Sequence, residues 1–90
     1  GSIYAPNSFS PDGDGVNDLF YVYGKDIVEF ELYIFDRWGE KLFYSTNMDM
    51  GWNGTYKGTL AKTETYVWKV KYRDILGDPG TMFGTVTLIR

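Results

Sequence analysis

The sequence contains no cysteine and no histidine among its 90 residues, and these two absences exclude several kinds of site. Without cysteine the chain has neither a disulfide framework nor a thiol nucleophile, and with histidine also missing it has no Cys/His zinc site. Catalytic schemes that need an imidazole base are excluded for the same reason. No apolar run approaches the roughly 20 residues of a membrane-spanning helix, and no segment resembles a signal peptide.

Positive charge is also scarce, since nine Lys and Arg stand against 12 Asp and Glu, a net charge of -3. An acidic chain of this kind is a poor ligand for a phosphate backbone, so we expect no nucleic-acid partner. Hydrophobic residues make up 43% and aromatics 19%, enough for one core in a single domain. The opening Gly1-Ser2 resembles a protease-cleavage remnant, so we expect the domain to occupy residues 3–90, as a monomer with no small-molecule substrate.

Hydrophobic residues recur with a period of two through most of the chain, a pattern typical of half-buried strands. In the clearest run, Tyr66, Trp68, Val70 and Tyr72 alternate with more polar residues. No segment of ten residues sustains a helical period, so no substantial helix is expected. The fold class predicted is all-β: a single antiparallel immunoglobulin-like β-sandwich of about seven short strands. The expected strands are 3–5, 19–23, 28–34, 42–46, 55–57, 66–73 and 82–89.

The aromatic residues are expected to serve mainly as core. The alternation places Trp68 on the core face, and we expect Trp52 to cover a core edge. Trp38 lies in a hairpin, from which it is expected to fold back over the sheet. The better candidates for an exposed aromatic patch are Tyr21, Tyr23, Tyr33 and Phe35.

The most unusual stretch is Asp12-Gly13-Asp14-Gly15-Val16-Asn17-Asp18. Ca²⁺ prefers six to eight oxygen ligands, and a short loop supplies them from carboxylates and backbone carbonyls while glycines let it coil. We expect carboxylate ligands from Asp12, Asp14 and Asp18, a carbonyl from Val16 and a side-chain oxygen from Asn17. The alternative is a loop without metal, in which the acids accept hydrogen bonds from backbone N–H groups.

Other polar residues offer little chemistry. Glu29 and Glu31 share a strand face that is expected to be solvated, which does not suit paired carboxylates in a cleft. Gly13-x-Gly15 lacks the Lys-Ser/Thr pair and the helix of a phosphate loop. No enzyme activity is therefore expected.

Four ordered motifs give the chain a family resemblance. Residues 6–20, PNSFSPDGDGVNDLF, resemble a family opening of the form PNaFTPNGDGxND.F, and residues 34–40, IFDRWGE, are similar to its IFNRWGE. Residues 51–58, GWNGTYKG, and the terminal GTVTLIR also match. The chain is thereby identified as resembling the gliding-motility-associated C-terminal domain, the type B sorting domain of type IX secretion in Bacteroidota.

The resemblance implies a function that composition alone does not give. Such domains end very large cell-surface adhesins that reach the periplasm by an N-terminal signal and cross the outer membrane through the type IX machinery. The implied partners are that machinery and its type B-specific outer-membrane component, and the implied location is the cell surface. Because Arg90 ends the last motif, the chain is expected to end at or near the native C-terminus.

Two other functions remain open at this stage: a Ca²⁺-dependent carbohydrate-binding or adhesive module, and an immunoglobulin-like spacer. A sorting domain needs a surface that a partner reads, and the terminal strand is expected at or near a sheet edge, where strand addition takes place. We expect partner contacts from Thr85, Thr87 and Arg90 of this strand, and otherwise from Arg37 and Trp38 of the 36–40 hairpin.

Overall fold

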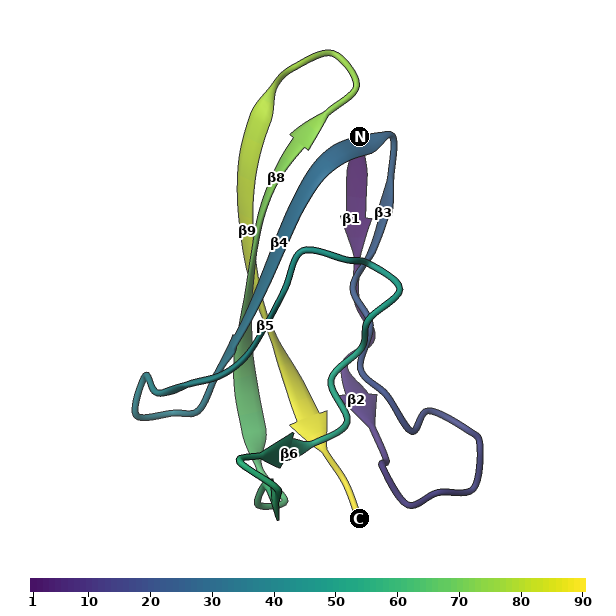
Figure 1. Ribbon diagram of the computed structural model, residues 1–90, viewed down its shortest axis with the longest axis vertical. Coiled ribbons are helices and arrows are strands. Elements are labelled where there is room, and N and C mark those ends of the chain that lie inside the picture. Colours follow the sequence, from purple (N-terminus) through teal and green to yellow (C-terminus); the bar gives the residue numbers. More distant parts are fainter.

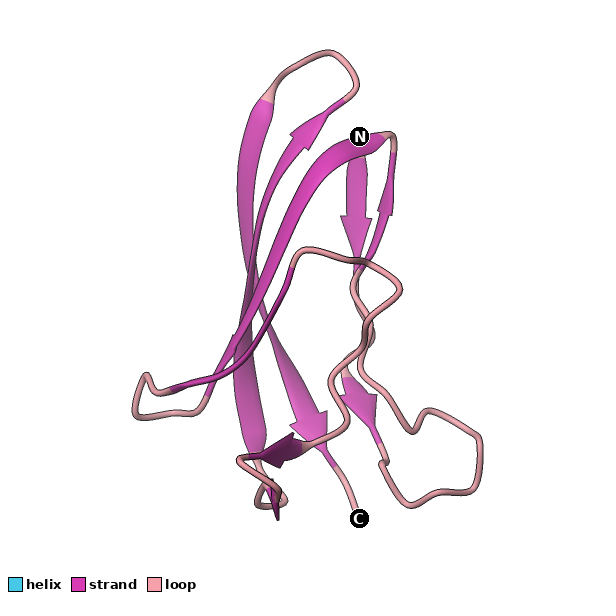
Figure 2. Ribbon diagram, viewed as in Figure 1, coloured by secondary structure: helices cyan, strands magenta, loops and turns pink.

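The computed structural model describes residues 1–90 and contains nine strands and no helix, so nothing in it could span a membrane as a helix (Figures 1 and 2). The all-β prediction is therefore confirmed. The strands are β1 (Ser2–Tyr4), β2 (Ser8–Phe9), β3 (Tyr23–Lys25), β4 (Ile27–Phe35), β5 (Lys41–Ser45), β6 (Thr55–Tyr56), β7 (Thr59–Leu60), β8 (Thr65–Asp74) and β9 (Pro79–Leu88).

Five strands form the main sheet, in the order β2-β9-β8-β4-β5. All its pairs are antiparallel except β2 with β9, which is parallel. A second layer faces this sheet in Figure 1 and contains the antiparallel pair β1–β3. The layer continues through an isolated bridge between Phe20 and Trp52, and a β6–β7 hairpin lies near the C-terminus.

The core lies between the two layers and is rich in aromatic rings. The indole of Trp52 is central: its ring centroid is 5.5 Å from that of Phe9 and 5.1 Å from that of Tyr66, with Trp52 only 1% exposed. Its Nε1 donates to the carbonyl of Thr55 at 2.9 Å, so the indole N–H is satisfied. The prediction that Trp52 and Trp68 belong to the core is confirmed, since Trp68 is 5% exposed.

Alternation fails at the start of β4, where the hydrophobic period of two in the predicted strand 28–34 would place Val28 on the same face as Phe30. Val28 is 60% exposed, because the β4–β8 register shifts between Ile27 and Glu29. Beyond this irregularity the period of two is regular, and it buries Phe30, Leu32 and Ile34.

The segment 19–23 is also not a continuous strand, since only Phe20 pairs there, through the bridge to Trp52, and β3 begins at Tyr23. Ser2, expected to belong to a cleavage remnant, is the first residue of β1.

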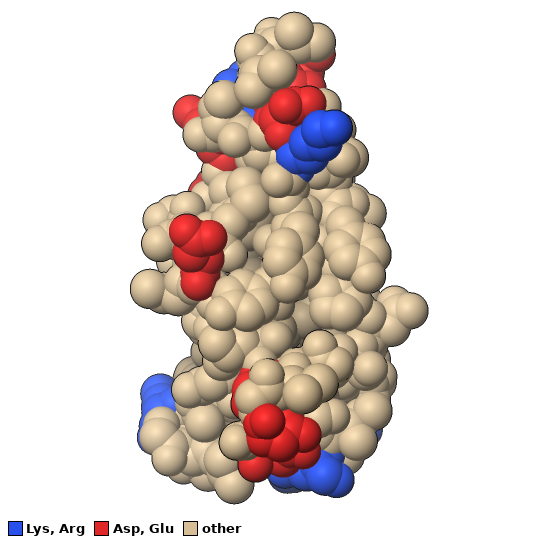
Figure 3. Space-filling model, turned by 90° about the vertical axis from the view of Figure 1, so that its right-hand side faces the viewer, with Lys and Arg blue, Asp and Glu red and all other residues tan.

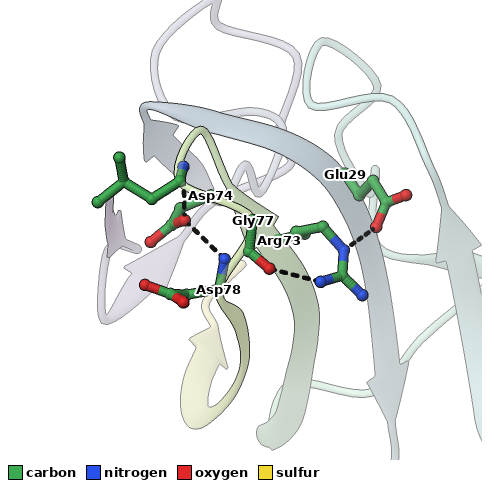
Figure 4. Close-up of polar contacts among 6 residues, drawn as sticks. Glu29, Arg73, Asp74, Gly77 and Asp78 are labelled. Carbon is green, nitrogen blue, oxygen red and sulfur yellow. Dashed lines mark hydrogen bonds and ion pairs between the residues drawn. The ribbon is translucent and has the colours of Figure 1, made fainter.

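The turn between β8 and β9 is fixed by two side chains (Figure 4). Asp74 Oδ1 accepts the backbone N–H groups of Leu76 and Asp78, at 2.9 and 3.0 Å. Arg73 forms an ion pair with Glu29 of β4 at 2.9 Å and donates to the carbonyl of Gly77. The pKa of Asp74 is lowered, first by the hydrogen bond from the Asp78 N–H and also by the bond from the Leu76 N–H. Burial acts in the opposite direction but does not outweigh them. Side-chain hydrogen bonds and an ion pair thus connect this turn to β4 and to its own backbone.

Candidate functional site

The acidic loop extends outward between β2 and Phe20 as a closed coil at the lower end of the molecule (Figure 1). The backbone N–H of Ser10 donates to the carbonyl of Asn17 at 2.8 Å and closes it. Gly13, Gly15 and Asn17 have positive φ angles of 81°, 83° and 52°, which the coil requires and glycine adopts without strain. Figure 3 shows acidic side chains gathered near this end of the molecule.

The predicted carboxylates are brought together. One oxygen from each of Asp12, Asp14 and Asp18 lies within 4.8 Å of the others. The capping interactions of the alternative prediction are also present. Asp12 Oδ1 accepts the N–H of Asp14, Asp14 Oδ1 accepts the N–H of Val16, and the two oxygens of Asp18 accept the N–H groups of Gly13 and Gly15, at 2.7–3.1 Å. The same three side chains therefore shape the loop and present oxygen atoms at its surface.

The chemistry of this cluster suits a hard cation. None of its carboxylates forms an ion pair with Lys or Arg in the structure, so their mutual repulsion is not offset by a protein cation. Each carboxylate oxygen has a second lone pair beyond the N–H bond that it accepts. The exposed acidic trio could thus bind a metal ion.

The hairpin between β4 and β5 has the other predicted residues at its tip. Asp36 Oδ1 accepts the N–H groups of Trp38 and Glu40, both at 2.9 Å, and so fixes the turn. Trp38 is 81% exposed, so the expectation that it folds back over the sheet is wrong. The guanidinium of Arg37 lies 5.1 Å from the Trp38 ring centroid, a cation–π distance. The ring instead lies beside Arg37 and forms part of the wall of an open groove.

A groove of about 230 Å³ lies beside this hairpin, and sequence reasoning did not find it. Its walls are the hairpin, the β6–β7 turn region and the start of β8, with Leu60 66% exposed at its rim. The sequence did not reveal the groove because strand β7 has only two residues, too few to show a hydrophobic period. Leu60 of this strand is exposed. Half of the lining is hydrophobic, namely Trp38, Leu42, Tyr56, Leu60, Ala61 and Tyr66.

The three residues predicted on the terminal strand differ in their surroundings. Thr87 is paired on both sides, with Thr65 of β8 and Ser8 of β2, and is not at an edge. The guanidinium of Arg90 donates to the carbonyls of Gly54 and Ala61, at 3.1 and 3.0 Å, and so ties the chain end to the β6–β7 region. Thr85 is exposed and lies beyond the reach of β2. Of this set, Thr85 is the residue free to meet a partner through its backbone.

A row of side chains crosses the outer face of the main sheet and was only partly expected. The register aligns Tyr44, Tyr33, Lys69 and Phe83 on four successive strands. Lys69 Nζ lies 5.7 Å from each of the Tyr33 and Phe83 ring centroids. The hydroxyl groups of Tyr44 and Tyr33 both donate to Glu31, and these two bonds lower the pKa of that carboxyl. Tyr33 and Phe35, expected in an exposed patch, are half-buried here.

The tyrosines Tyr21 and Tyr23 lie on the opposite layer, where Tyr23 is 53% exposed. The ring centroid of Tyr23 is 6.1 Å from that of Tyr4 and 6.0 Å from that of Tyr21, with the rings tilted by 30° and 39°. This row is therefore a tilted ladder and not a flat platform. The broad middle of this face carries few charged side chains (Figure 3).

Comparison with known proteins adds the family. Residues 3–86 match the family described as the CHU_C Type IX secretion signal domain, which spans nearly the whole chain. No curated protein matches the chain. The matched region contains the acidic loop, the 36–40 hairpin and β9 as far as Val86, whereas Thr87 and Arg90 of the terminal motif lie beyond it. The chain therefore belongs to the CHU_C type IX secretion signal domain family, a non-catalytic C-terminal signal that sorts proteins for secretion across the outer membrane to the cell surface.

Proposed function

We propose that this domain is a folded sorting signal on a large, adhesin-like surface protein. The type IX outer-membrane machinery recognises it together with a type B-specific outer-membrane component. The observation that carries the proposal is the family match over residues 3–86. The fold supports it, because it is a compact β-structure whose capped turns hold their side chains in fixed positions. Its exposed features are suited to contact a protein and not to transform a substrate.

Within the domain, we assign first contact to the 36–40 hairpin and the groove beside it. Trp38 combines a large exposed ring with a cationic neighbour, Arg37, and aromatic and arginine side chains dominate the energetic centres of protein interfaces. A reporter fused ahead of residues 1–90 in a type IX-competent bacterium tests this assignment. Trp38→Ala is expected to reduce surface delivery at least tenfold, whereas Lys57→Ala, also exposed but outside the groove lining, serves as the matched control. Equal delivery of the two variants would contradict the assignment.

We further propose that the acidic loop binds Ca²⁺. Asp12, Asp14 and Asp18 would supply carboxylate oxygens, with the Val16 carbonyl and the Asn17 side chain completing the set. The proposal is supported by the 4.8 Å grouping of the three oxygens and by their lack of a protein cation. The ion would stabilise the folded state by about 2.7 kcal/mol at a hundredfold excess over Kd.

Thermal melts test the calcium proposal directly. The midpoint is expected to rise between EDTA and millimolar CaCl₂, and the rise should disappear in Asp14→Asn. Thr46→Ala, exposed and remote from the loop in sequence, should keep the full calcium response. A midpoint that is identical with EDTA and with CaCl₂ would refute calcium binding while leaving the sorting function intact.

The alternative of a carbohydrate-binding module needs a flat row of exposed aromatic rings. The tryptophans do not form such a row, because Trp38 is exposed but Trp52 is only 1% exposed. The Tyr4–Tyr23–Tyr21 row is exposed in part but tilted. We therefore retain the sorting function as the conclusion.

A further inference from the structure

The strand β9 has an open edge along most of its length. On one side it pairs with β8 from Pro79 to Thr87 without a register shift. On the other side β2 pairs only with Thr87 and Leu88, because the chain before Asn7 crosses to the second layer and pairs as β1 with β3. Figure 1 shows the upper part of β9 with no strand on its outer side.

The alternating direction of the backbone N–H groups along β9 shows which of them lie at this edge. The N–H groups of Thr87 and Ile89 point outward, since they donate to Asn7 and Phe9, whereas the N–H of Leu88 points to Glu64 on the β8 side. Because donors alternate along an antiparallel strand, the outward groups further up are those of the odd-numbered residues. The N–H and C=O groups of Thr81, Phe83 and Thr85 are consequently available to an added strand.

A second observation at the same edge indicates what kind of strand it would accept. Trp68 is 5% exposed, yet its Nε1 has no hydrogen-bond partner. The indole extends from β8 across the inner side of β9 at Gly84, so that a Cβ on Gly84 would lie 2.7 Å from Nε1. A buried N–H without an acceptor destabilises the folded state, because it has lost its hydrogen bond to water and gained none in exchange. The cost is removed if an acceptor reaches Nε1, and because that atom has almost no exposed area in the free domain, its covering groups must move when a strand is added.

Resting on the proposed function, we propose that an extended segment of the outer-membrane partner adds to β9 at residues 81–85. The segment presents a short side-chain acceptor, such as Asn, Asp, Ser or Thr, opposite Gly84. With Phe83 and Thr85 bonded to the added strand, Gly84 faces a non-hydrogen-bonded position, where cross-strand side chains approach most closely. Gly84 has no side chain, and the indole of Trp68 occupies the space that one would fill, which places Nε1 beside this position of the strand.

Charge on the outer face favours an acidic segment. Beside the open edge, the outward residues of β8 include Lys69, Lys71 and Arg73, and Lys69 already lies against the Phe83 ring. Only Arg73 among them forms an ion pair, with Glu29. Glu31 of β4 lies opposite Lys71, but Lys69 and Lys71 form no ion pair. Acidic side chains on the outer face of the added strand would be attracted by these two lysines, and basic side chains would be repelled. The occupant is an extended, acidic peptide segment that carries an acceptor on its inner face.

Phe83→Pro tests the backbone part of the proposal. It removes an N–H that the free domain does not use, and proline is tolerated at an edge position whose N–H faces away from the sheet. Phe83→Ala is the matched control, because it removes the same ring but keeps the N–H. In the reporter fusion, Phe83→Pro is expected to reduce surface delivery at least tenfold relative to Phe83→Ala, with both variants folded. Normal delivery of Phe83→Pro would overturn the proposal, and so would a Phe83→Pro variant that fails to fold, since position 83 would then not behave as an open edge position that tolerates proline.

Trp68→Phe tests the indole without changing the backbone. It removes only the donor and part of the ring, so the variant is expected to fold while delivery falls several-fold. Delivery equal to that of the unchanged chain would overturn the acceptor assignment. If light scattering shows a dimer that Phe83→Pro abolishes, the occupant is a second copy of the chain and the partner assignment is wrong. Failure of the unchanged fusion to reach the surface would instead refute the proposed function itself.

Discussion

The largest single loss of stability is expected from Trp52→Ala. A tryptophan buries about 150–250 Å² on folding, which at about 25 cal/mol per Å² gives roughly 4–6 kcal/mol as an upper estimate. The 74° edge contact with Tyr66 adds about 0.5–1.5 kcal/mol, and the bond to Thr55 adds about 1 kcal/mol. Alanine retains part of the burial, and the core relaxes around the cavity. We therefore expect a cost of about 4–5 kcal/mol, at the upper end for such truncations.

That cost is large for a chain of this size. Ninety residues correspond to a total stability of about 5–13 kcal/mol, so Trp52→Ala should remove a third or more of it and lower the midpoint by about 15 °C or more. Urea unfolding followed by circular dichroism measures the change. Trp38→Ala is the control, because Trp38 is 81% exposed and its loss should stay within about 0.5 kcal/mol. Similar costs for the two variants would refute the placement of Trp52 at the centre of the core.

Two further predictions concern charge and backbone conformation. Because hydrogen bonds from Tyr44 and Tyr33 lower the pKa of Glu31, its contribution is present above the unfolded pKa of about 4.3 and is lost as the pH falls through the folded value. The stability difference between the unchanged chain and Glu31→Gln should therefore shrink from pH 6 to pH 3 in urea titrations; a difference that grows would contradict these bonds. Gly54→Ala should cost more than Gly58→Ala in the same assay. Both residues have positive φ, of 79° and 77°, but only at Gly54 would the new Cβ meet other side chains, at 3.1 Å. Equal losses of stability in the two variants would show that backbone strain alone, and not the contacts of the new Cβ, determines the loss.

The regular strands were predictable because their information is local. Alternation in β4, β8 and the end of β9 identified the core face, and burial of Tyr66, Trp68 and Val70 confirms it. The acidic loop was equally accessible, since Asx-type capping acts between residues two to five apart. Both predictions rest on contacts that the sequence places side by side.

Features that depend on non-local pairing were not predictable in this way. The edge of β9 is defined by where β2 stops, and β2 is two residues long and lies about 80 residues away along the chain. Val28 is exposed because of a register shift that alternation cannot reveal. The burial of Trp68 Nε1 without a partner, and its position beside Gly84, follow only from the packing of β8 with β9. The position of the strand at the chain end therefore predicted a sheet edge. In the structure the open edge lies at residues 81–85, whereas Thr87 is paired on both sides.

The most direct test of the sorting function is protease accessibility of a reporter on intact cells. A periplasmically targeted reporter fused ahead of residues 1–90 is produced in a type IX-competent bacterium and in the same strain without its type IX translocon. Added protease should digest most of the reporter on the competent cells and leave it intact in the translocon-deficient cells. A reporter that stays protected in both strains, while the domain is folded, would contradict the assignment of this chain as a secretion signal.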